Sequence, residues 1–166
     1  GAIALAIGGL ILFDDAAGSL RVSGCALRLR RTAAEAIVTY KGPRAAEAGV
    51  AFSTEIGVGP ATLLADPEGV RLVLRNLLDN AVRYTPRGGR ITLRSAVAEE
   101  GIALQVEDTG SGIPQEHLSR VFERFYRADP SRSREAGGTG LGLSIVKHLV
   151  ESMGGEVGVE PNTPNG

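Results

Sequence analysis

The sequence predicts a two-layer α/β sandwich, in which helices cover a mixed sheet. Two observations favour this class. The predicted elements follow the order helix, strands, helix, hairpin, long loop, helix and strand, so both kinds of element alternate along the chain. The chain has 166 residues, of which 43% are apolar and 22% charged, and this is enough for a single globular domain with its own core.

Composition also excludes some classes of function. The formal net charge is −1, so no overall cationic field attracts nucleic acid. The single cysteine, Cys25, cannot form a disulfide within the chain, which agrees with a reducing compartment.

The first element is an apolar run, GAIALAIGGLILF. It is shorter than the about 20 residues that cross a bilayer, and it lacks the basic start and cleavage site of a signal peptide. Ile3, Ile7 and Leu10 have helical spacing, so we expect the end of a helix that packs on a partner outside this sequence.

Residues 31–49 also have a helical pattern, with Ala33, Ala36, Ile37 and Tyr40 on one face and Gly49 as the stop. Residues 50–56 and 61–65 are then expected to be strands around a turn.

The next helix has the clearest signals. Asp66 is a favourable N-cap, Pro67 suits the first helical position, and the pattern continues to about Thr85. Its apolar face consists of Leu74, Leu77, Leu78, Ala81 and Val82.

The rest of the chain predicts a hairpin, a long irregular segment, a helix and a strand. The hairpin covers residues 91–98 and 101–108, and the last helix and strand cover residues 141–153 and 155–160. Between them, residues 109–140 contain one short helical pattern, at residues 114–125. Such a long loop is uncommon in a compact domain unless it is functional.

Asn76 and Asn80 are the first candidates for chemistry. They lie four residues apart on a predicted helix and share one face, with Arg83 and Tyr84 one turn further. An amide carbonyl oxygen suits Mg²⁺ that takes its other ligands from phosphates and water, and Arg neutralises phosphate charge. The alternative is that both are surface residues or hydrogen-bonded core amides.

Two glycine-rich motifs follow. In Asp-Thr-Gly-Ser-Gly, residues 108–112, the carboxylate after a strand can accept a hydrogen bond from the exocyclic amine of adenine, or it can form an ordinary tight turn. In GGTGLGL, residues 137–143, glycines before a helix expose N–H groups that suit phosphate; a flexible hinge is the alternative.

Residues 122–127, FERFYR, separate these motifs. We expect Phe122 and Phe125 to anchor the loop and to hold Arg124 and Arg127 near the glycine cradle. The alternative is a hydrophobic staple with solvated charges.

The order of NLLDNAVRYTP, DTGSGIP, VFERFYR and GGTGLGLSIVKHLVE strongly resembles the N, G1, F and G2 boxes of the ATP-binding catalytic domain of bacterial sensor histidine kinases. The resemblance covers about residues 27–160. It implies the α+β Bergerat fold of gyrase-type ATPases and MutL, a two-layer α/β sandwich. In that fold a mixed sheet has helices on one face, and ATP lies under a long lid, here about residues 109–140.

The resemblance also implies residue roles. Asn80 would bind Mg²⁺ and Asn76 would support the ion and the phosphates, while Arg83 and Tyr84 would contact the nucleotide. Asp108 would read adenine and Arg127 would reach the terminal phosphate. The base pocket and the phosphate cradle would consist of Gly110, Gly112, Ile113, Gly138, Thr139, Gly140, Leu141, Gly142 and Leu143.

By the same resemblance, the chain would donate the γ-phosphoryl group of Mg-ATP to a histidine on a separate dimerisation domain, in two-component signalling with a response regulator. The parent protein would be a homodimer, anchored in the inner membrane, with this domain in the cytoplasm. Residues 1–26 would be a remnant of the dimerisation helix and linker, and residues 27–166 a catalytic domain truncated before its last strand. His117 and His148 lack the phosphoacceptor context H-E-x-R-T-P, so the acceptor is expected elsewhere.

Hydrolytic relatives have a Glu where this sequence has Asn76. Because an amide cannot act as a general base, a kinase is favoured over an ATPase. A related ATPase, a serine kinase and a nucleotide-binding module without turnover remain alternatives.

Overall fold

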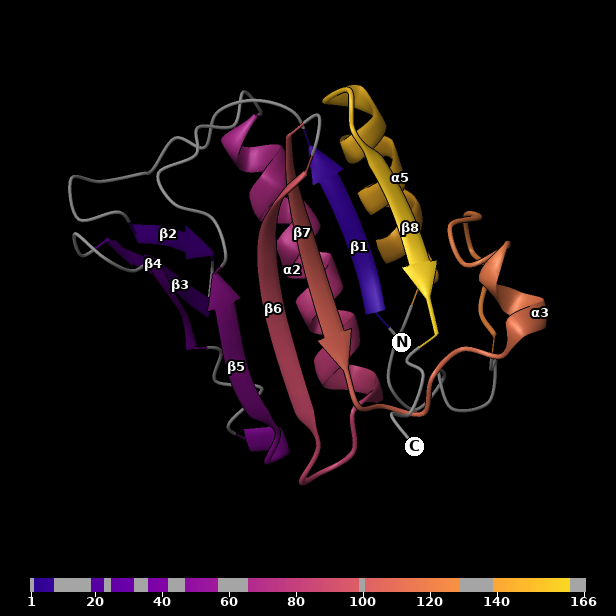
Figure 1. The fold of residues 1–166 in the computed structure, drawn as a ribbon. Coiled ribbons are helices and arrows are strands. Elements are labelled where there is room, and N and C mark those ends of the chain that lie inside the picture. The colour runs from indigo at the N-terminus through magenta and orange to yellow at the C-terminus, as the bar shows by residue number, and fades with distance from the viewer. Residues whose placement is uncertain are drawn as a thin grey trace.

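The computed structural model describes residues 2–7, 19–22, 25–31, 36–41, 47–56, 66–98, 101–128 and 139–161. Within these residues, a five-stranded sheet has the order β5-β6-β7-β1-β8 (Figure 1). Its strands are β1 (Ala2–Ile7), β5 (Ala51–Ile56), β6 (Arg90–Ala98), β7 (Gly101–Asp108) and β8 (Glu156–Glu160). The β5–β6 pair is parallel and the other pairs are antiparallel, so the sheet is mixed, as predicted.

Helices α2 (Pro67–Tyr84) and α5 (Gly142–Ser152) pack against each other and cover one face of this sheet (Figure 1). The prediction of an α+β two-layer sandwich is therefore confirmed. A second sheet contains β2 (Ser19–Val22), β3 (Cys25–Arg31) and β4 (Ala36–Lys41). None of the helices in the described ranges is both long and apolar enough to cross a bilayer.

Helix α2 begins where the sequence predicts. The carboxylate of Asp66 accepts hydrogen bonds from the backbone N–H groups of Glu68 and Gly69, at 3.1 and 3.0 Å, and Pro67 occupies the first turn. The helix ends where the N–H of Thr85 donates to the carbonyl of Ala81. Such an N-cap contributes about 1 kcal/mol, so local signals fix the register of the side chains on α2.

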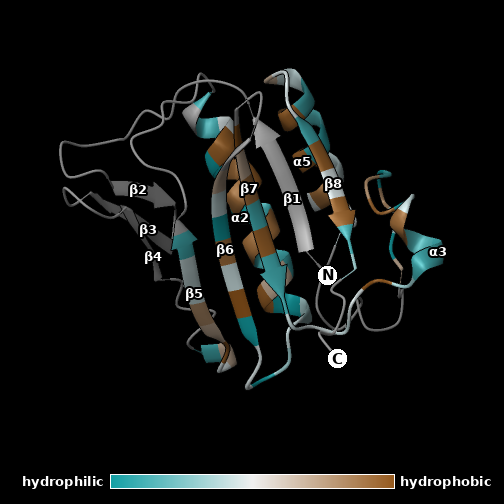
Figure 2. Ribbon diagram, viewed as in Figure 1, coloured by the Kyte–Doolittle hydropathy of each residue, from teal (hydrophilic) through white to brown (hydrophobic). Residues whose placement is uncertain are grey.

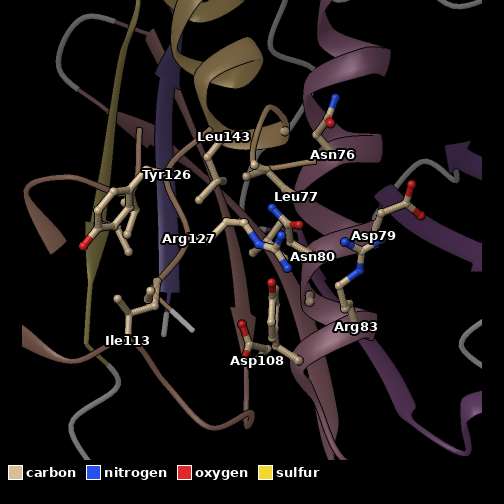
Figure 3. A pocket seen from close by; sticks show the side chains of 18 of the residues that line it. Asn76, Leu77, Asp79, Asn80, Arg83, Asp108, Ile113, Tyr126, Arg127 and Leu143 are labelled. Carbon is tan, nitrogen blue, oxygen red and sulfur yellow. The ribbon is translucent and has the colours of Figure 1, made fainter. Parts of the chain in front are cut away.

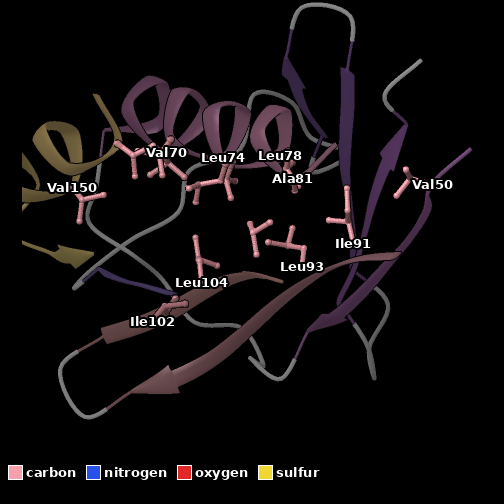
Figure 4. Packing of buried hydrophobic residues seen from close by; sticks show 14 residues of the cluster. Val50, Val70, Leu74, Leu78, Ala81, Ile91, Leu93, Ile102, Leu104 and Val150 are labelled. Atoms are coloured by element: carbon pink, nitrogen blue, oxygen red, sulfur yellow. The ribbon is translucent and has the colours of Figure 1, made fainter. Parts of the chain in front are cut away.

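The core lies between the two helices and the sheet (Figure 4). Hydrophobic and hydrophilic residues alternate along β7 and β8, as Figure 2 shows, because successive strand residues face opposite sides. The largest fully buried side chains belong to Val73, Leu77, Ile91, Val146 and Val150. Removing most of a buried leucine of this kind costs about 2–5 kcal/mol.

The helix predicted at the N-terminus is wrong where the structure describes it, because Ala2–Ile7 forms strand β1. Large apolar residues alternate here with alanine, and the pairing matches this alternation. Ile3 lies in register with Val106 and Val159, and Leu5 with Leu104 and Val157. Because β1 pairs with β7 on one edge and with β8 on the other, more of its backbone N–H and C=O groups are hydrogen-bonded than in an isolated helix end. The division of the chain after residue 26 stays a prediction.

The helix predicted over residues 31–49 is wrong at residues 31 and 36–41, whereas residues 47–48 are helical and Gly49, with a φ of 67°, follows them as the predicted stop. Cys25–Arg31 and Ala36–Lys41 form the antiparallel strands β3 and β4. The run Ile37, Val38, Thr39 and Tyr40 is rich in β-branched and aromatic residues, which favour strands over helices. The strand predicted at residues 61–65 lies outside the described residues, as do residues 129–138 of the predicted lid.

The remaining elements agree with the predictions. The strand predicted at 50–56 is β5, the hairpin is β6–β7, and the last helix and strand are α5 and β8. The helical pattern at residues 114–125 is only partly helical, since α3 covers Gln115–Leu118.

Candidate functional site

A cavity of about 600 Å³ lies between α2, the ends of β7 and β8, the segment after β7 and the start of α5 (Figure 3). The predicted site residues that line it come from four separate stretches of sequence: Asn76, Asn80, Arg83, Tyr84, Asp108, Gly112, Ile113, Arg127, Thr139, Gly140, Leu141, Gly142 and Leu143. Gly110 does not line the cavity, and Gly138 lies outside the described residues.

The two asparagines face the start of α5. The Nδ2 of Asn76 donates a hydrogen bond to the carbonyl of Leu72, at 2.7 Å. A Cβ atom added to Gly142 would lie 3.1 Å from the Oδ1 of Asn76 and 3.7 Å from the Nδ2 of Asn80. Both amides therefore reach the cavity where α5 begins, and Gly142 keeps this space free of a side chain.

The start of α5 favours anions. Leu141 at the N-cap makes no side-chain capping hydrogen bond, and the first hydrogen bond of the helix runs from the N–H of Ile145 to the carbonyl of Leu141. The N–H groups of the first turn therefore have no acceptor within the helix. Together with the helix dipole, they suit a phosphate group better than a cation.

Asp108 lies at the end of β7 and forms a tight turn. Its Oδ1 accepts a hydrogen bond from the N–H of Gly110, at 2.8 Å. A Cβ atom on Gly110 would lie 2.5 Å from the carbonyl oxygen of Tyr84 and 2.6 Å from this Oδ1. Only glycine fits here, so Gly110 shapes the turn that brings Asp108 to the cavity without lining the cavity itself.

The segment after α3 is held by its backbone. Phe125 has a φ of 63°, and its N–H donates to the carbonyl of Gly140 at 2.9 Å. Its side chain is 70% exposed, so the predicted aromatic anchor is wrong at this position. Phe122 is half-buried, and Val121 supplies the buried side chain instead. The left-handed backbone turns Phe125 outward, and the sequence alone did not indicate this.

Tyr126 is a wall residue that the sequence analysis missed. Its hydroxyl lies 2.6 Å from Nδ1 of His117, which is half-buried. The guanidinium carbon of Arg120 lies 4.3 Å from the centre of the Tyr126 ring. Arg120 also binds the carboxylate of Glu123 at 3.1 and 3.0 Å, and this hydrogen bond lowers the pKa of Glu123.

The cavity combines apolar and charged groups. Leu77, Val106 and Val159 supply apolar surface, while Asp79, Arg83, Asp108 and Arg127 supply both signs of charge. Figure 3 shows the side chains of Asn80 and Arg127 pointing into the cavity. Within the described residues, no three His, Cys, Asp or Glu side chains gather as a metal cluster. The arrangement therefore suits a flat apolar group joined to an anionic group.

The family model described as "Histidine kinase-, DNA gyrase B-, and HSP90-like ATPase" matches residues 65–166. The chain is 50% identical over 101 residues to the probable sensor kinase SilS of Salmonella typhimurium, covering 61% of this chain and 20% of SilS. It is 42% identical over 127 residues to the sensor protein IrlS of Burkholderia pseudomallei (strain K96243), covering 76% of this chain and 27% of IrlS. The chain thus spans only 20% of the length of SilS and 27% of that of IrlS.

Solved structures show the same similarity. The mycobacterial sensor histidine kinase MprB matches with a TM-score of 0.56 and 36% identity, over 67% of this chain and 69% of the MprB chain. Full-length ShkA in complex with AMPPNP matches with a TM-score of 0.58 and 34% identity, over 68% of this chain and 22% of ShkA.

Proposed function

Because this chain belongs to the family of histidine kinase-, DNA gyrase B- and HSP90-like ATPases, we propose that its cavity binds Mg-ATP and that the chain donates the γ-phosphoryl group to a histidine on a separate dimerisation domain. The observation that carries this proposal is the convergence of residues from four separate stretches of sequence on one cavity. The AMPPNP complex of ShkA supports the choice of nucleotide, since AMPPNP is an ATP analogue.

The adenine would lie over the apolar part of the cavity. The carboxylate of Asp108 would accept a hydrogen bond from the exocyclic amine of adenine, while guanine presents a carbonyl oxygen there and would be repelled. Gly112 and Ile113 would border the base, and Tyr84, which is 43% exposed, would flank the nucleotide at the cavity mouth.

The phosphates would lie between α2 and the start of α5. Arg83, the free N–H groups of the first turn and the backbone from Thr139 to Leu143 would bind them. Gly138 would belong to the same cradle.

The donor set fits Mg²⁺. This ion takes one or two protein oxygens and completes its shell with phosphates and waters, so it needs no cluster of carboxylates. The amide oxygen of Asn80 would hold the ion, Asn76 would support it, and Gly142 leaves the space. A bound Mg²⁺ would neutralise phosphate charge.

Transfer would depend on positioning and on charge. Arg127 would contact the terminal phosphate, whose bond to the ADP oxygen breaks as a bond to the histidine nitrogen forms. Asn76 cannot activate water as a base, which favours transfer over hydrolysis. As neither His117 nor His148 lies in the phosphoacceptor context, the acceptor would be on the partner domain, and a response regulator would receive the phosphoryl group next.

The likeness to sensor kinases supports the wider context. The parent protein would be a homodimer anchored in the inner membrane, with this domain on the cytoplasmic side. Residues 27–166 would form the catalytic domain, to whose sheet residues 2–7 contribute strand β1.

The direct test is to mix this chain with γ-labelled ATP, Mg²⁺ and a separately supplied dimerisation domain. We expect an acid-labile phosphohistidine on that domain. Asn80→Ala should abolish the label, and Arg75→Ala is the matched control because Arg75 is exposed on the same helix and does not line the cavity. Release of free phosphate without a labelled acceptor would instead support a hydrolytic relative, and absence of ATP binding would refute the proposal.

A further inference from the structure

We propose that His117 is a positioning residue, which holds Tyr126 in the cavity wall and thereby sets the direction of Arg127 toward the terminal phosphate. This inference rests on the proposed function, because it assigns a role in binding ATP to a residue that does not line the cavity. It follows from three contacts that converge on Tyr126.

The first contact joins the two side chains. Nδ1 of His117 and the hydroxyl of Tyr126 are 2.6 Å apart, and both residues are half-buried. Their rings are tilted, with centroids 5.9 Å apart. A phenol can donate or accept a hydrogen bond, so either tautomer of His117 can keep this contact.

The second and third contacts hold the same ring and its backbone. The guanidinium of Arg120 lies over the ring at 4.3 Å, and Glu123 fixes that guanidinium with two hydrogen bonds. The N–H of Tyr126 also donates to the carbonyl of Glu123, at 3.3 Å. His117 is therefore the member of this cluster that ties Tyr126 to another element, the short helix α3.

His117 is itself well placed to act as a support. Its N–H donates to the carbonyl of Pro114 and its carbonyl accepts from the N–H of Arg120, both at 2.9 Å. Pro114 lines the cavity, so the support begins and ends at the cavity wall. Without the bond to His117, the contacts that remain to orient Tyr126 within the described part of the chain are those with Arg120 and those of its own backbone.

Arg127 follows Tyr126 directly, and this links the cluster to the phosphate. On the other side, the chain is held at Phe125, whose N–H binds the carbonyl of Gly140. Tyr126 and Arg127, which line the cavity together with Ala128, thus lie just after one fixed point, and His117 holds Tyr126 from the side. Loss of the lateral support should reduce contact with the terminal phosphate and leave the adenine pocket intact.

The test measures the affinities for Mg-ATP and Mg-ADP by calorimetry in the full chain. His117→Ala and Tyr126→Phe should each lower the affinity for Mg-ATP about three- to tenfold, which is the fold-change expected for one hydrogen bond. Each should change the affinity for Mg-ADP by less than about twofold. The double variant should be no weaker than either single variant. His117→Gln should recover part of the loss, and His148→Ala, on the exposed side of α5, should behave as the wild type.

A second background separates positioning from general stability. In Arg127→Ala, the change His117→Ala should cost no further ATP affinity, because the residue that it positions is gone. Three results would each overturn the inference: equal losses of affinity for ATP and for ADP, additive losses of ATP affinity in the double variant of His117 and Tyr126, or an unchanged ATP affinity. If His117→Ala fails to fold, Tyr126→Phe decides the matter, since it removes one oxygen atom only. A wild type that does not bind ATP would instead refute the proposed function.

Discussion

Replacing Gly140 with alanine should disrupt the phosphate side of the cavity through backbone strain. Gly140 has a φ of 72°, a left-handed conformation that L-residues with a Cβ rarely adopt. An added Cβ would lie 2.8 to 3.0 Å from three backbone atoms of Phe125. Because these are backbone atoms, no side chain can rotate away, and the two segments must separate.

The cost has two parts. The left-handed conformation costs an alanine about 1–2 kcal/mol. Separation of the segments also loses the 2.9 Å hydrogen bond from the N–H of Phe125 to the carbonyl of Gly140, whose net contribution is about 1 kcal/mol. We therefore expect Gly140→Ala to destabilise this region by about 2–3 kcal/mol.

Gly154→Ala is the matched control. Gly154 has a φ of 76°, and an added Cβ would meet no heavy atom within 4 Å, so it carries the conformational cost without the clash. Urea unfolding should show about 1–2 kcal/mol of destabilisation for Gly154→Ala, and calorimetry should show unchanged ATP affinity. Gly140→Ala should lose ATP affinity at least about tenfold, since 1.4 kcal/mol corresponds to tenfold. Equal ATP affinities for the two variants would refute the reasoning.

Three further outcomes are expected. Gly142→Ala should leave the free energy of unfolding unchanged or raise it, because alanine favours a helix. It should weaken Mg-ATP binding by crowding Asn76, whose Oδ1 would lie 3.1 Å from the new Cβ. A normal Mg-ATP affinity measured by calorimetry would contradict this. Arg94 donates a hydrogen bond to Glu55 and holds the pKa of this carboxyl below its ordinary value of 4.5. The unfolded chain therefore takes up the proton first, and stability falls as the pH drops below that value. Glu55→Gln should flatten the acid side of the plot of stability against pH, and an unchanged slope would count against the pair. Ala4→Pro should lower the unfolding midpoint strongly, because position 4 pairs with β7 on one side and with β8 on the other. The control Ala4→Thr keeps the N–H group and should have an unfolding midpoint near that of the wild type. A small effect of the proline would contradict the interior position of β1.

Local signals account for the parts of the fold that the sequence predicted correctly. Helix α2 has the side-chain cap of Asp66 and the first-turn proline, and the β6–β7 hairpin has two alternating runs beside each other in the chain. The site residues of the C-terminal half of α2 converge with Asp108 at the end of β7 and with the glycines at the start of α5.

The parts that were wrong depend on long-range pairing. Ile3 and Ile7 fit a helical spacing and an alternating one equally well, and only the pairing of β1 with β7 and β8 decides between them. The exposed position of the Phe125 side chain depends on the hydrogen bond from its backbone N–H to the carbonyl of Gly140, which lies 15 residues later in the sequence. The contact between His117 and Tyr126 joins the short helix α3 to the irregular segment after it, and no periodicity predicts which side chains meet there.

The central claim is that the cavity binds an adenine nucleotide through Asp108 and Asn80. The most direct measurement is a calorimetric titration of this chain with Mg-ATP and with Mg-GTP, repeated with Asp108→Asn. The wild type should bind ATP and not GTP at the same concentrations, and Asp108→Asn should lose this preference. A folded wild type that binds neither nucleotide at millimolar concentration, or that binds both equally, would contradict the claim.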